Sequence, residues 1–401
     1  MHLLRNFYKE LSLKPQGFTM IVASFLPVFA IVAMFPIVAL IIDHFRTIPN
    51  AAIKVPAMVT APGYAIALLA PFAGLATDRF GRRRLLLICT FFYGIIGTAP
   101  FLLESIDTII ASRILLGVCE AGILTVVNTL IADYWDDGGR RNWLMLQGFV
   151  VPLINPLVFL LVAAVAAVRW NAGFLVYAIA FPVFVAMVLW AFEPKRPAPQ
   201  LDPSEAGRFP MASALLVCTV TLLTALLYFV FVVNGSIAWR EIGVTDPMEV
   251  SKATFGPSLF VVVGALLFRL VSRYTNAVQI ALFLCLLGFG LAGIGMARTV
   301  TEMQAALMIH QTGAGMTVPS LIAWAQSKFA FAHRGRGMGL WTSAFFLGQA
   351  LSPIVVGNLA AGSGSMKLAF VQAGMAGLVA CAGVLLLSMI SEGWGLRRGW
   401  R

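Results

Sequence analysis

Two ionisable residues, Arg113 and Glu120, stand seven positions apart within one apolar run of the sequence. In an α-helix, seven steps bring the second side chain to within about 20° of the first, about two turns away. Glu120 is the one acidic residue near the centre of any apolar run, where an ionisable group is costly and points to function. A carboxyl group there can bind and release a proton, and a nearby arginine changes how readily it does so. The alternative is a structural Glu120, hydrogen-bonded to a neighbouring helix.

A second titratable residue, His310, also lies inside an apolar run, 190 positions after Glu120. Histidine titrates near neutral pH, so His310 is a candidate for proton exchange or for ligand binding. The alternative is that His310 is a packing residue whose hydrogen bonds are satisfied. Polar residues at other depths are candidates for lining a substrate cavity, and Tyr228 is a candidate amphipathic residue of its wall. The polar residues are Asn128, Gln147, Asn155, Gln311 and Gln349.

A polar segment between two apolar runs reads Gly74-Leu-Ala-Thr-Asp78-Arg79-Phe-Gly81-Arg82-Arg83-Arg84. Its glycines allow two helix ends to approach closely. The Asp78 carboxylate can interact with helix N-termini and accept hydrogen bonds from basic side chains. The three consecutive arginines are suited to anionic lipid headgroups. The arginines alone would be enough to set the membrane topology, so the aspartate and the glycines indicate a further role for this segment.

The elements that carry these residues are expected to be membrane-spanning helices. Of 401 residues, 60% are hydrophobic and 11% are charged, and the mean hydropathy is +0.90. This composition excludes a soluble globular enzyme, a disordered protein and a secreted disulfide scaffold. The strands of a membrane barrel alternate polar with apolar residues, which also does not fit. Twelve apolar runs of about 20 residues are predicted to span the membrane, at 18–42, 55–76, 85–103, 107–131, 143–168, 172–192, 211–235, 251–271, 277–297, 302–325, 338–360 and 367–390.

The basic residues lie in the gaps between these runs. The chain has 28 Lys and Arg against 17 Asp and Glu, a net charge of +11. With the N-terminus inside, 20 of the 28 fall on inner segments and 7 on outer ones, and Arg113 remains within a span. This bias predicts that both termini are cytoplasmic. It also argues against a nucleic-acid partner.

The longest polar gap divides the chain into two halves. It runs over residues 193–210, is rich in proline and charge, and predicts a cytoplasmic linker between six-helix bundles at 1–192 and 211–401. The halves resemble each other, because Gly74, Arg79 and Arg83 recur 190 positions later as Gly264, Arg269 and Arg273. Such internal symmetry is a mark of alternating-access transporters.

The loop segment 74–84 resembles the signature G-x-x-x-D-R-x-G-R-R-[RK] between helices 2 and 3 of the major facilitator superfamily. Arg113-Ile-Leu-Leu-Gly117 resembles the R-x-x-x-G signature of its helix 4. Glu120-Ala matches a pair found in Spinster-type lipid exporters and organic-anion symporters, and segment 334–341 resembles bacterial efflux permeases. The resemblance covers nearly the whole chain. It implies two pseudo-symmetric bundles of six helices, with helices 1, 4, 7 and 10 around a central cavity.

The resemblance also implies residue roles. The family uses Gly74, Asp78, Arg79, Gly81, Arg82 and Arg83 as a conformational latch, and associates the helix-4 signature, here Arg113, with proton coupling. We expect a monomeric secondary transporter of a bacterial inner membrane, with a small molecule, protons and membrane lipids as its partners. No Walker loop or hydrolase motif is present, so no enzyme activity, cofactor or metal is expected, and a proton gradient supplies the energy.

The favoured activity is proton-coupled export, by antiport, of an amphipathic or hydrophobic small molecule. One alternative is proton symport of a small organic anion into the cell, with Arg113 or His310 holding its carboxylate. A second is export of a lipid or lysolipid. The last is a receptor-like protein that transports nothing.

Overall fold

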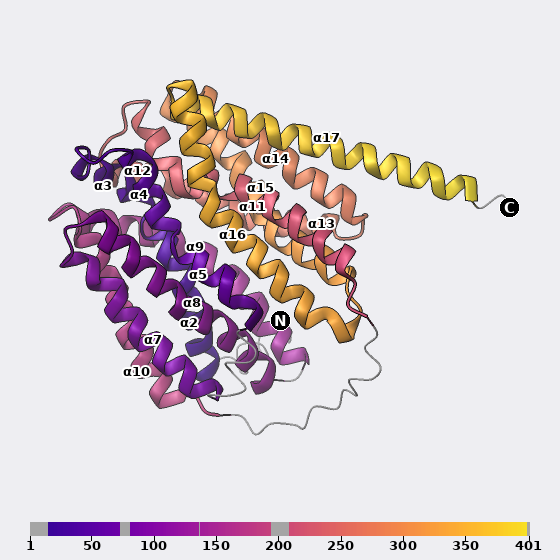
Figure 1. Ribbon diagram of the computed structural model, residues 1–401, viewed down its shortest axis with the longest axis horizontal. Helices are drawn as coiled ribbons and strands as arrows, with labels where there is room; N and C mark the ends of the chain where they lie inside the picture. Colours follow the sequence, from indigo (N-terminus) through magenta and orange to yellow (C-terminus); the bar gives the residue numbers. More distant parts are fainter. Residues whose placement is uncertain (1–14, 73–80, 136, 194–207, 399–401) are drawn as a thin grey trace, which may run out of the picture. The chain divides into compact units, whose positions relative to one another are not determined.

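The fold is that of a computed structural model, which describes residues 15–72, 81–135, 137–193 and 208–398. Within these ranges every regular element is a helix and none is a strand (Figure 1). The chain divides into two compact units, one within residues 1–205 and the other within 206–401. The predicted all-α architecture of twelve membrane-spanning segments, six in each half, is confirmed. Most of the predicted linker, 193–210, lies outside the described residues.

Prolines interrupt the first two spans of the first unit. The first span consists of α2 (Pro15–Val32), the short 3-10 helix η1 (Phe35–Ile37) and α3 (Val38–His44). Pro36 lacks the N–H that a continuous α-helix would need at that point. The second span consists of α4 (Ala51–Thr60), α5 (Pro62–Leu69) and η2 (Ala70–Phe72), and it bends by 42° at the break before Pro62.

The remaining spans follow the predicted order. In the first unit they are α7 (Arg82–Thr98) with η3 (Ala99–Phe101), α8 (Ile106–Tyr134), α9 (Asp137–Ala166), and η4 (Ala172–Ile179) with α10 (Ala180–Trp190). In the second unit they are α11 (Met211–Arg240), α12 (Pro247–Ser258) with α13 (Phe260–Val271), α14 (Asn276–Met296), α15 (Val300–Ser327), α16 (Phe331–Ser363) and α17 (Met366–Arg398).

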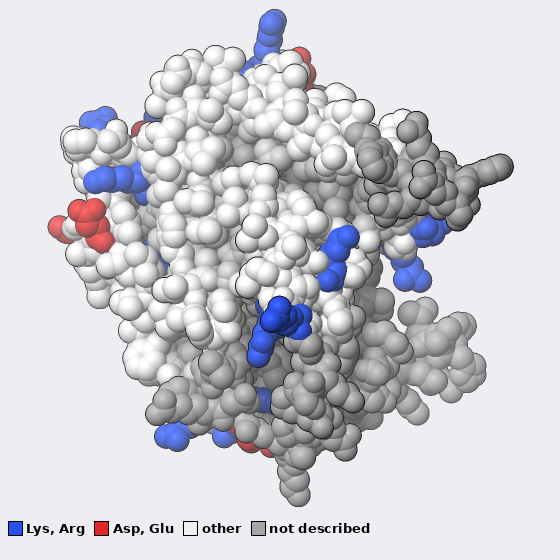
Figure 2. All heavy atoms as spheres, turned by 45° about the vertical axis from the view of Figure 1, so that its right-hand side comes forward, with Lys and Arg blue, Asp and Glu red and all other residues white. Residues whose placement is uncertain are grey.

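Among the described residues, nine helices are long and apolar enough to cross a membrane, and the bent α4–α5 pair makes a tenth. The other two spans are α9 and α15. Helix α15 is less apolar because it carries polar residues, among them His310 and Gln311, and both of these side chains are buried. The face of the molecule in Figure 2 has broad areas without a charged side chain. The His310 and Gln311 side chains of α15 therefore lie inside the second unit.

Small residues bring pairs of helices into backbone contact. In the first unit, a Cβ atom at Gly117 of α8 would clash with the carbonyl oxygen of Pro62 in α5. In the second, a Cβ atom at Gly264 of α13 would clash with the carbonyl oxygen of Thr312 in α15, and one at Gly315 with that of Val261. Such close approach is how membrane helices associate without a hydrophobic driving force.

One acidic side chain joins the first and last helices of the second unit. Glu241, directly after α11, accepts hydrogen bonds from the backbone nitrogens of Met366 (2.6 Å) and Lys367 (3.1 Å). It also accepts one from Ser365 Oγ at 2.7 Å. The backbone nitrogens of Met366 and Lys367 are among those that a helix leaves unpaired at its start. Glu241 therefore caps α17, the yellow helix in Figure 1.

Candidate functional site

The two ionisable residues of α8 are buried inside the first unit. The exposed fraction is 1% for Arg113 and 0% for Glu120. Helix α8 packs against α7, α5 and α2 of the same unit. This places both residues where the sequence predicts them, in the interior of a spanning bundle.

Arg113 is directed toward α7 and η4. Its Nη2 donates a hydrogen bond to the carbonyl oxygen of Gly97 at 2.8 Å. Its guanidinium carbon lies 4.7 Å from the ring centroid of Tyr177 and 5.0 Å from that of Phe174. Cation–π contacts of this kind strengthen when water is excluded. The guanidinium is thus engaged by groups of its own unit.

Two tyrosines fix the surroundings of this guanidinium. Tyr177 donates a hydrogen bond to the carbonyl oxygen of Ala30, and Tyr93 donates one to that of Leu26, both at 2.6 Å. The tyrosine rings are 5.8 Å apart. Because both acceptors belong to α2, the hydrogen bonds tie α7 and η4 to the first span.

Glu120 differs from Arg113 in having no hydrogen bond. Neither of its carboxyl oxygens has a hydrogen-bond partner within the part of the chain that the structure describes. Burying an ionised carboxylate without a partner is costly, whereas a carboxylic acid is buried at much lower cost. No described residue therefore supplies the hydrogen bond that the structural alternative for Glu120 requires.

His310 is fully buried in the second unit. Its ring centroid lies 5.7 Å from that of Phe231 in α11, and neither ring nitrogen has a hydrogen-bond partner among the described residues. Gly290 of α14 faces it, because a Cβ atom there would lie 2.5 Å from backbone atoms of His310. Packing against Phe231 and Gly290 thus holds His310 in place.

The helix starts give a different register from the 190-residue repeat. Helices α7 and α14 begin at Arg82 and Asn276, and α8 and α15 at Ile106 and Val300, so both pairs are 194 residues apart. Counted this way, Glu120 matches a position four residues after His310. Four residues are about one helical turn, so Glu120 and His310 occupy similar faces of their own helices at positions that differ by one turn.

The other predicted cavity residues are spread over both units. In the first, Asn155 of α9 has a buried side-chain oxygen without a partner among the residues that the structure describes. The side chains of Asn128 and Gln147 lie outside the described residues. In the second, Gln311 is buried. Gln349 of α16 is fully buried, and none of its amide atoms has a partner among the described residues. Tyr228 of α11 is half-buried against Phe345.

The predicted latch is described only from Gly81 onward, since Gly74, Asp78 and Arg79 lie outside the described residues. Gly81 has a positive φ of 78°, a conformation that suits glycine. The next two backbone nitrogens, of Arg82 and Arg83, donate hydrogen bonds to the Glu193 carboxylate at 2.9 and 2.7 Å. Glu193 therefore caps the start of α7.

Further hydrogen bonds fasten the segment after α10 to the same region. Arg83 donates from Nε to the carbonyl oxygen of Ala191 and from Nη2 to that of Val188, at 2.6 and 2.9 Å. Tyr134, at the end of α8, donates its hydroxyl to the carbonyl oxygen of Phe192 at 2.6 Å. We call Arg83, Tyr134 and Glu193 the α7 clamp. No local sequence pattern marks Tyr134 or Glu193 as a site residue; the one available signal is an acid 110 residues from a basic cluster.

We expect Glu193→Ala to loosen the α7 clamp. Two backbone N–H groups at a helix start would lose their acceptor and its favourable charge, which is worth about 1 kcal/mol at an exposed site. The apparent melting temperature of the purified protein should fall by about 2–4 °C. Glu104→Ala, at an exposed position, is the control. Equal melting temperatures for the two variants would show that the cap adds no stability.

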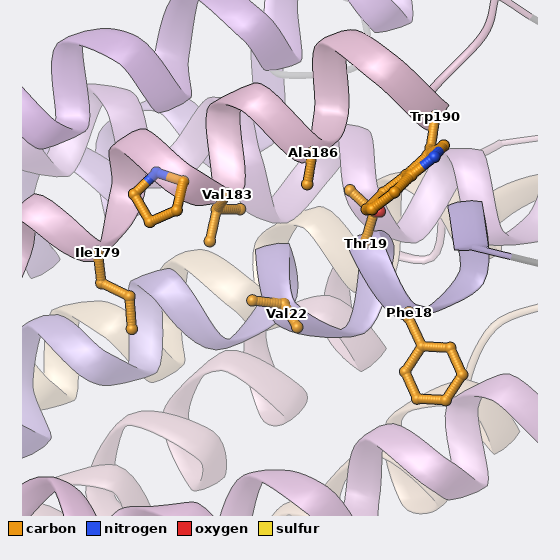
Figure 3. Close-up of a pocket in the computed structure, with 8 residues that line it drawn as sticks. Phe18, Thr19, Val22, Ile179, Val183, Ala186 and Trp190 are labelled. Atoms are coloured by element: carbon orange, nitrogen blue, oxygen red, sulfur yellow. The ribbon is translucent and has the colours of Figure 1, made fainter.

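A shallow apolar hollow of about 300 Å³ lies between α2 and α10 (Figure 3). Phe18, Thr19 and Val22 line one side, and residues of η4 and α10, including Ala186 and Trp190, line the other. Phe18 and Trp190 are each about half exposed. None of the candidate site residues lines this hollow, which has the character of a lipid-facing groove.

Comparison with known proteins places the chain in a family. Residues 17–329 match the model of the Major Facilitator Superfamily. A triacylglyceride transporter of Mycobacteroides abscessus is 28% identical over 176 residues, which are 41% of this chain and 32% of that protein. The match thus spans about a third of the length of this relative.

Solved transporter structures share the fold at low sequence identity. The nucleoside transporter NupG (D323A mutant) aligns with a TM-score of 0.75 and 12% identity, over 92% of this chain and 99% of the other. A bacterial homolog of the human lysosomal transporter Spinster aligns with a TM-score of 0.69 and 14% identity, over 92% and 94%. The chain belongs to the Major Facilitator Superfamily and is a membrane transporter rather than an enzyme.

Proposed function

We propose that this protein is a secondary transporter that exports an amphipathic or hydrophobic small molecule in exchange for protons. Glu120 carries the proposal: it is fully buried within a spanning helix and lacks a hydrogen-bond partner among the described residues. A carboxyl group in such a place can take up a proton in one state of the cycle and release it in another. The gradient of protons, rather than ATP, then supplies the energy.

The engagement of Arg113 supports export over symport of an organic anion. An anion bound there would have to displace the Gly97 carbonyl and two aromatic rings from the guanidinium. Arg113 instead fits a positioning role, in which its charge acts on Glu120 through the shared face of α8. His310 remains the candidate for a second proton site.

Export of a lipid is the second candidate. It is supported by the similarity to a triacylglyceride transporter, although that similarity covers 41% of this chain. We further propose that both termini are cytoplasmic in a bacterial inner membrane, that the protein is a monomer, and that the 74–83 loop acts as the latch. The charge bias along the sequence supports this orientation.

Counterflow in proteoliposomes separates these candidates. Vesicles with purified protein are preloaded with an uncharged aromatic amphiphile, and uptake of the labelled compound is followed with competitors outside. Export of small amphiphiles predicts competition by other uncharged drug-like molecules. Competition by carboxylates alone would indicate anion symport, and competition by acylglycerols alone would indicate lipid export.

A further inference from the structure

An aromatic and amide-bearing stripe runs along α16 in the second unit. Trp341, Phe345 and Gln349 are spaced four residues apart, so their side chains follow one another along one side of the helix. The Trp341 and Phe345 rings are stacked, with centroids 5.4 Å apart and planes 16° apart. The Tyr228 ring of α11 lies 5.8 Å from that of Phe345. We call these four residues the α16 stripe.

Both ends of the α16 stripe carry hydrogen-bonding groups without a partner. The indole Nε1 of Trp341 and both amide atoms of Gln349 are buried and make no hydrogen bond to any described residue. An amide offers two donors and an acceptor. Leaving it unsatisfied in an apolar interior costs free energy that an apolar residue of similar size would not cost.

Two neighbouring polar residues on α16 form hydrogen bonds. Thr342 donates its hydroxyl to the carbonyl oxygen of Met338 at 3.0 Å. Ser352 donates to the carbonyl oxygen of Leu226 in α11 at 2.9 Å. Among the described residues of α16, the buried polar groups without a partner are therefore those of Trp341 and Gln349 in the stripe and the hydroxyl of Ser343 beside it.

Close packing fixes the stripe relative to α11. A Cβ atom at Gly348 would lie 2.6 Å from the Cβ of Ala225 and 2.7 Å from the carbonyl oxygen of Leu222. Gln349 directly follows Gly348 in the chain. About one turn further along α16, Ser352 forms its hydrogen bond to α11. A surface held in this way is preorganised, which lowers the entropic cost of binding a ligand.

The buried polar groups of the second unit are uncharged residues or histidines. Among its described residues, the buried polar side chains are Thr, Ser, Asn, Gln and His, and none is Asp, Glu, Lys or Arg. The buried charges of the described chain, Arg113 and Glu120, both lie in the first unit. A ligand that carries a full charge would find no opposite charge beside the stripe.

We infer that the α16 stripe is a substrate-binding surface for uncharged molecules with an aromatic or flat apolar body and hydrogen-bonding groups. The body stacks along Phe345 and Tyr228, while hydroxyl, amide or carbonyl groups pair with Trp341 and Gln349. These two residues are about 12 Å apart along the helix, enough for a ligand of two ring widths. The inference deepens the proposed export function and rests on it.

Equilibrium binding tests the stripe without requiring transport. The probe is radiolabelled chloramphenicol, an uncharged aromatic molecule with hydroxyl and amide groups, and the purified protein is held in lipid nanodiscs. Gln349→Leu should weaken binding about tenfold, because a ligand group then loses its partner in a buried site. Trp341→Phe keeps the stacking and should weaken binding by a smaller factor. 4-Nitrobenzoate, an aromatic anion, should not compete.

Thr342→Val is the matched control, because Thr342 adjoins the stripe and its hydroxyl is already paired within α16. It should bind as the wild type does, and all variants should elute as monodisperse protein. Wild-type affinity in both Gln349→Leu and Trp341→Phe would overturn the stripe while leaving the export function in place. A wild type that binds 4-nitrobenzoate but not chloramphenicol would overturn the ligand class and the proposed export together.

Discussion

Replacing Glu120 by Gln should abolish pH-driven transport while leaving substrate binding intact. Glutamine has nearly the same volume as protonated glutamic acid, so the packing around α8 should persist. It cannot release a proton, however, so a cycle that needs Glu120 in two protonation states stops. Exchange of substrate across the membrane without net proton movement should survive, because that half of the cycle uses one state only.

The decisive measurement is substrate-induced proton movement in liposomes, followed with a pH-sensitive dye. The Glu120→Gln protein should give the signal of protein-free vesicles, and counterflow in the same preparation should continue. Glu104→Gln, the same change at an exposed site, should move protons at the wild-type rate. Wild-type proton movement by Glu120→Gln would make Glu120 structural and leave His310 as the next coupling residue.

Gly117→Ala should strongly impair folding. A methyl group at this position of α8 would lie 2.6 Å from the Cα of Pro62 and would clash with its carbonyl oxygen. These are backbone atoms, so α5 would have to move away as a whole. Overpacking of this kind typically costs about 1–3 kcal/mol. We expect the amount of monodisperse protein to fall severalfold.

For a glycine of α17 we expect the opposite result, no loss of stability on substitution by alanine. Gly383 of α17 has no atom within 4 Å of an added Cβ, and alanine favours a helix over glycine by about 1 kcal/mol. Gly383→Ala should therefore match or exceed the wild type in size-exclusion profile and melting temperature. If Gly117→Ala also matched the wild type, the close approach of α8 and α5 would not be needed for the fold, and Gly117 of the helix-4 signature would require another explanation.

The sequence was sufficient to predict the membrane spans, because a run of about 20 apolar residues has few alternatives to forming a membrane helix. It did not predict the interruptions at Pro36 and Pro62, since proline is tolerated within some membrane helices and breaks others. It did place Arg113, Glu120 and His310 in the interior. The orientation of the Arg113 guanidinium could not be predicted, because Gly97 and Tyr177 belong to other helices.

Contacts between distant segments account for most of what the sequence missed. Glu193 and the start of α7 are 111 residues apart, and no local pattern marks a carboxylate as the cap of a remote helix. Gln349 was identified as polar, but its place in the α16 stripe depends on how α16 packs against Tyr228. The second copy of the 190-residue repeat, with Gly264 and Arg269, lies within α13, whereas the helices that follow begin 194 residues apart, a difference of about one turn.

The Glu241 cap has a consequence for biosynthesis. Glu241 leaves the ribosome 125 residues before Met366, to which it bonds in the finished protein. The second unit therefore cannot close this end until its last helix has entered the membrane. A chain that ends before α17 would leave the Glu241 carboxylate without these three hydrogen-bond donors, so this contact is completed last.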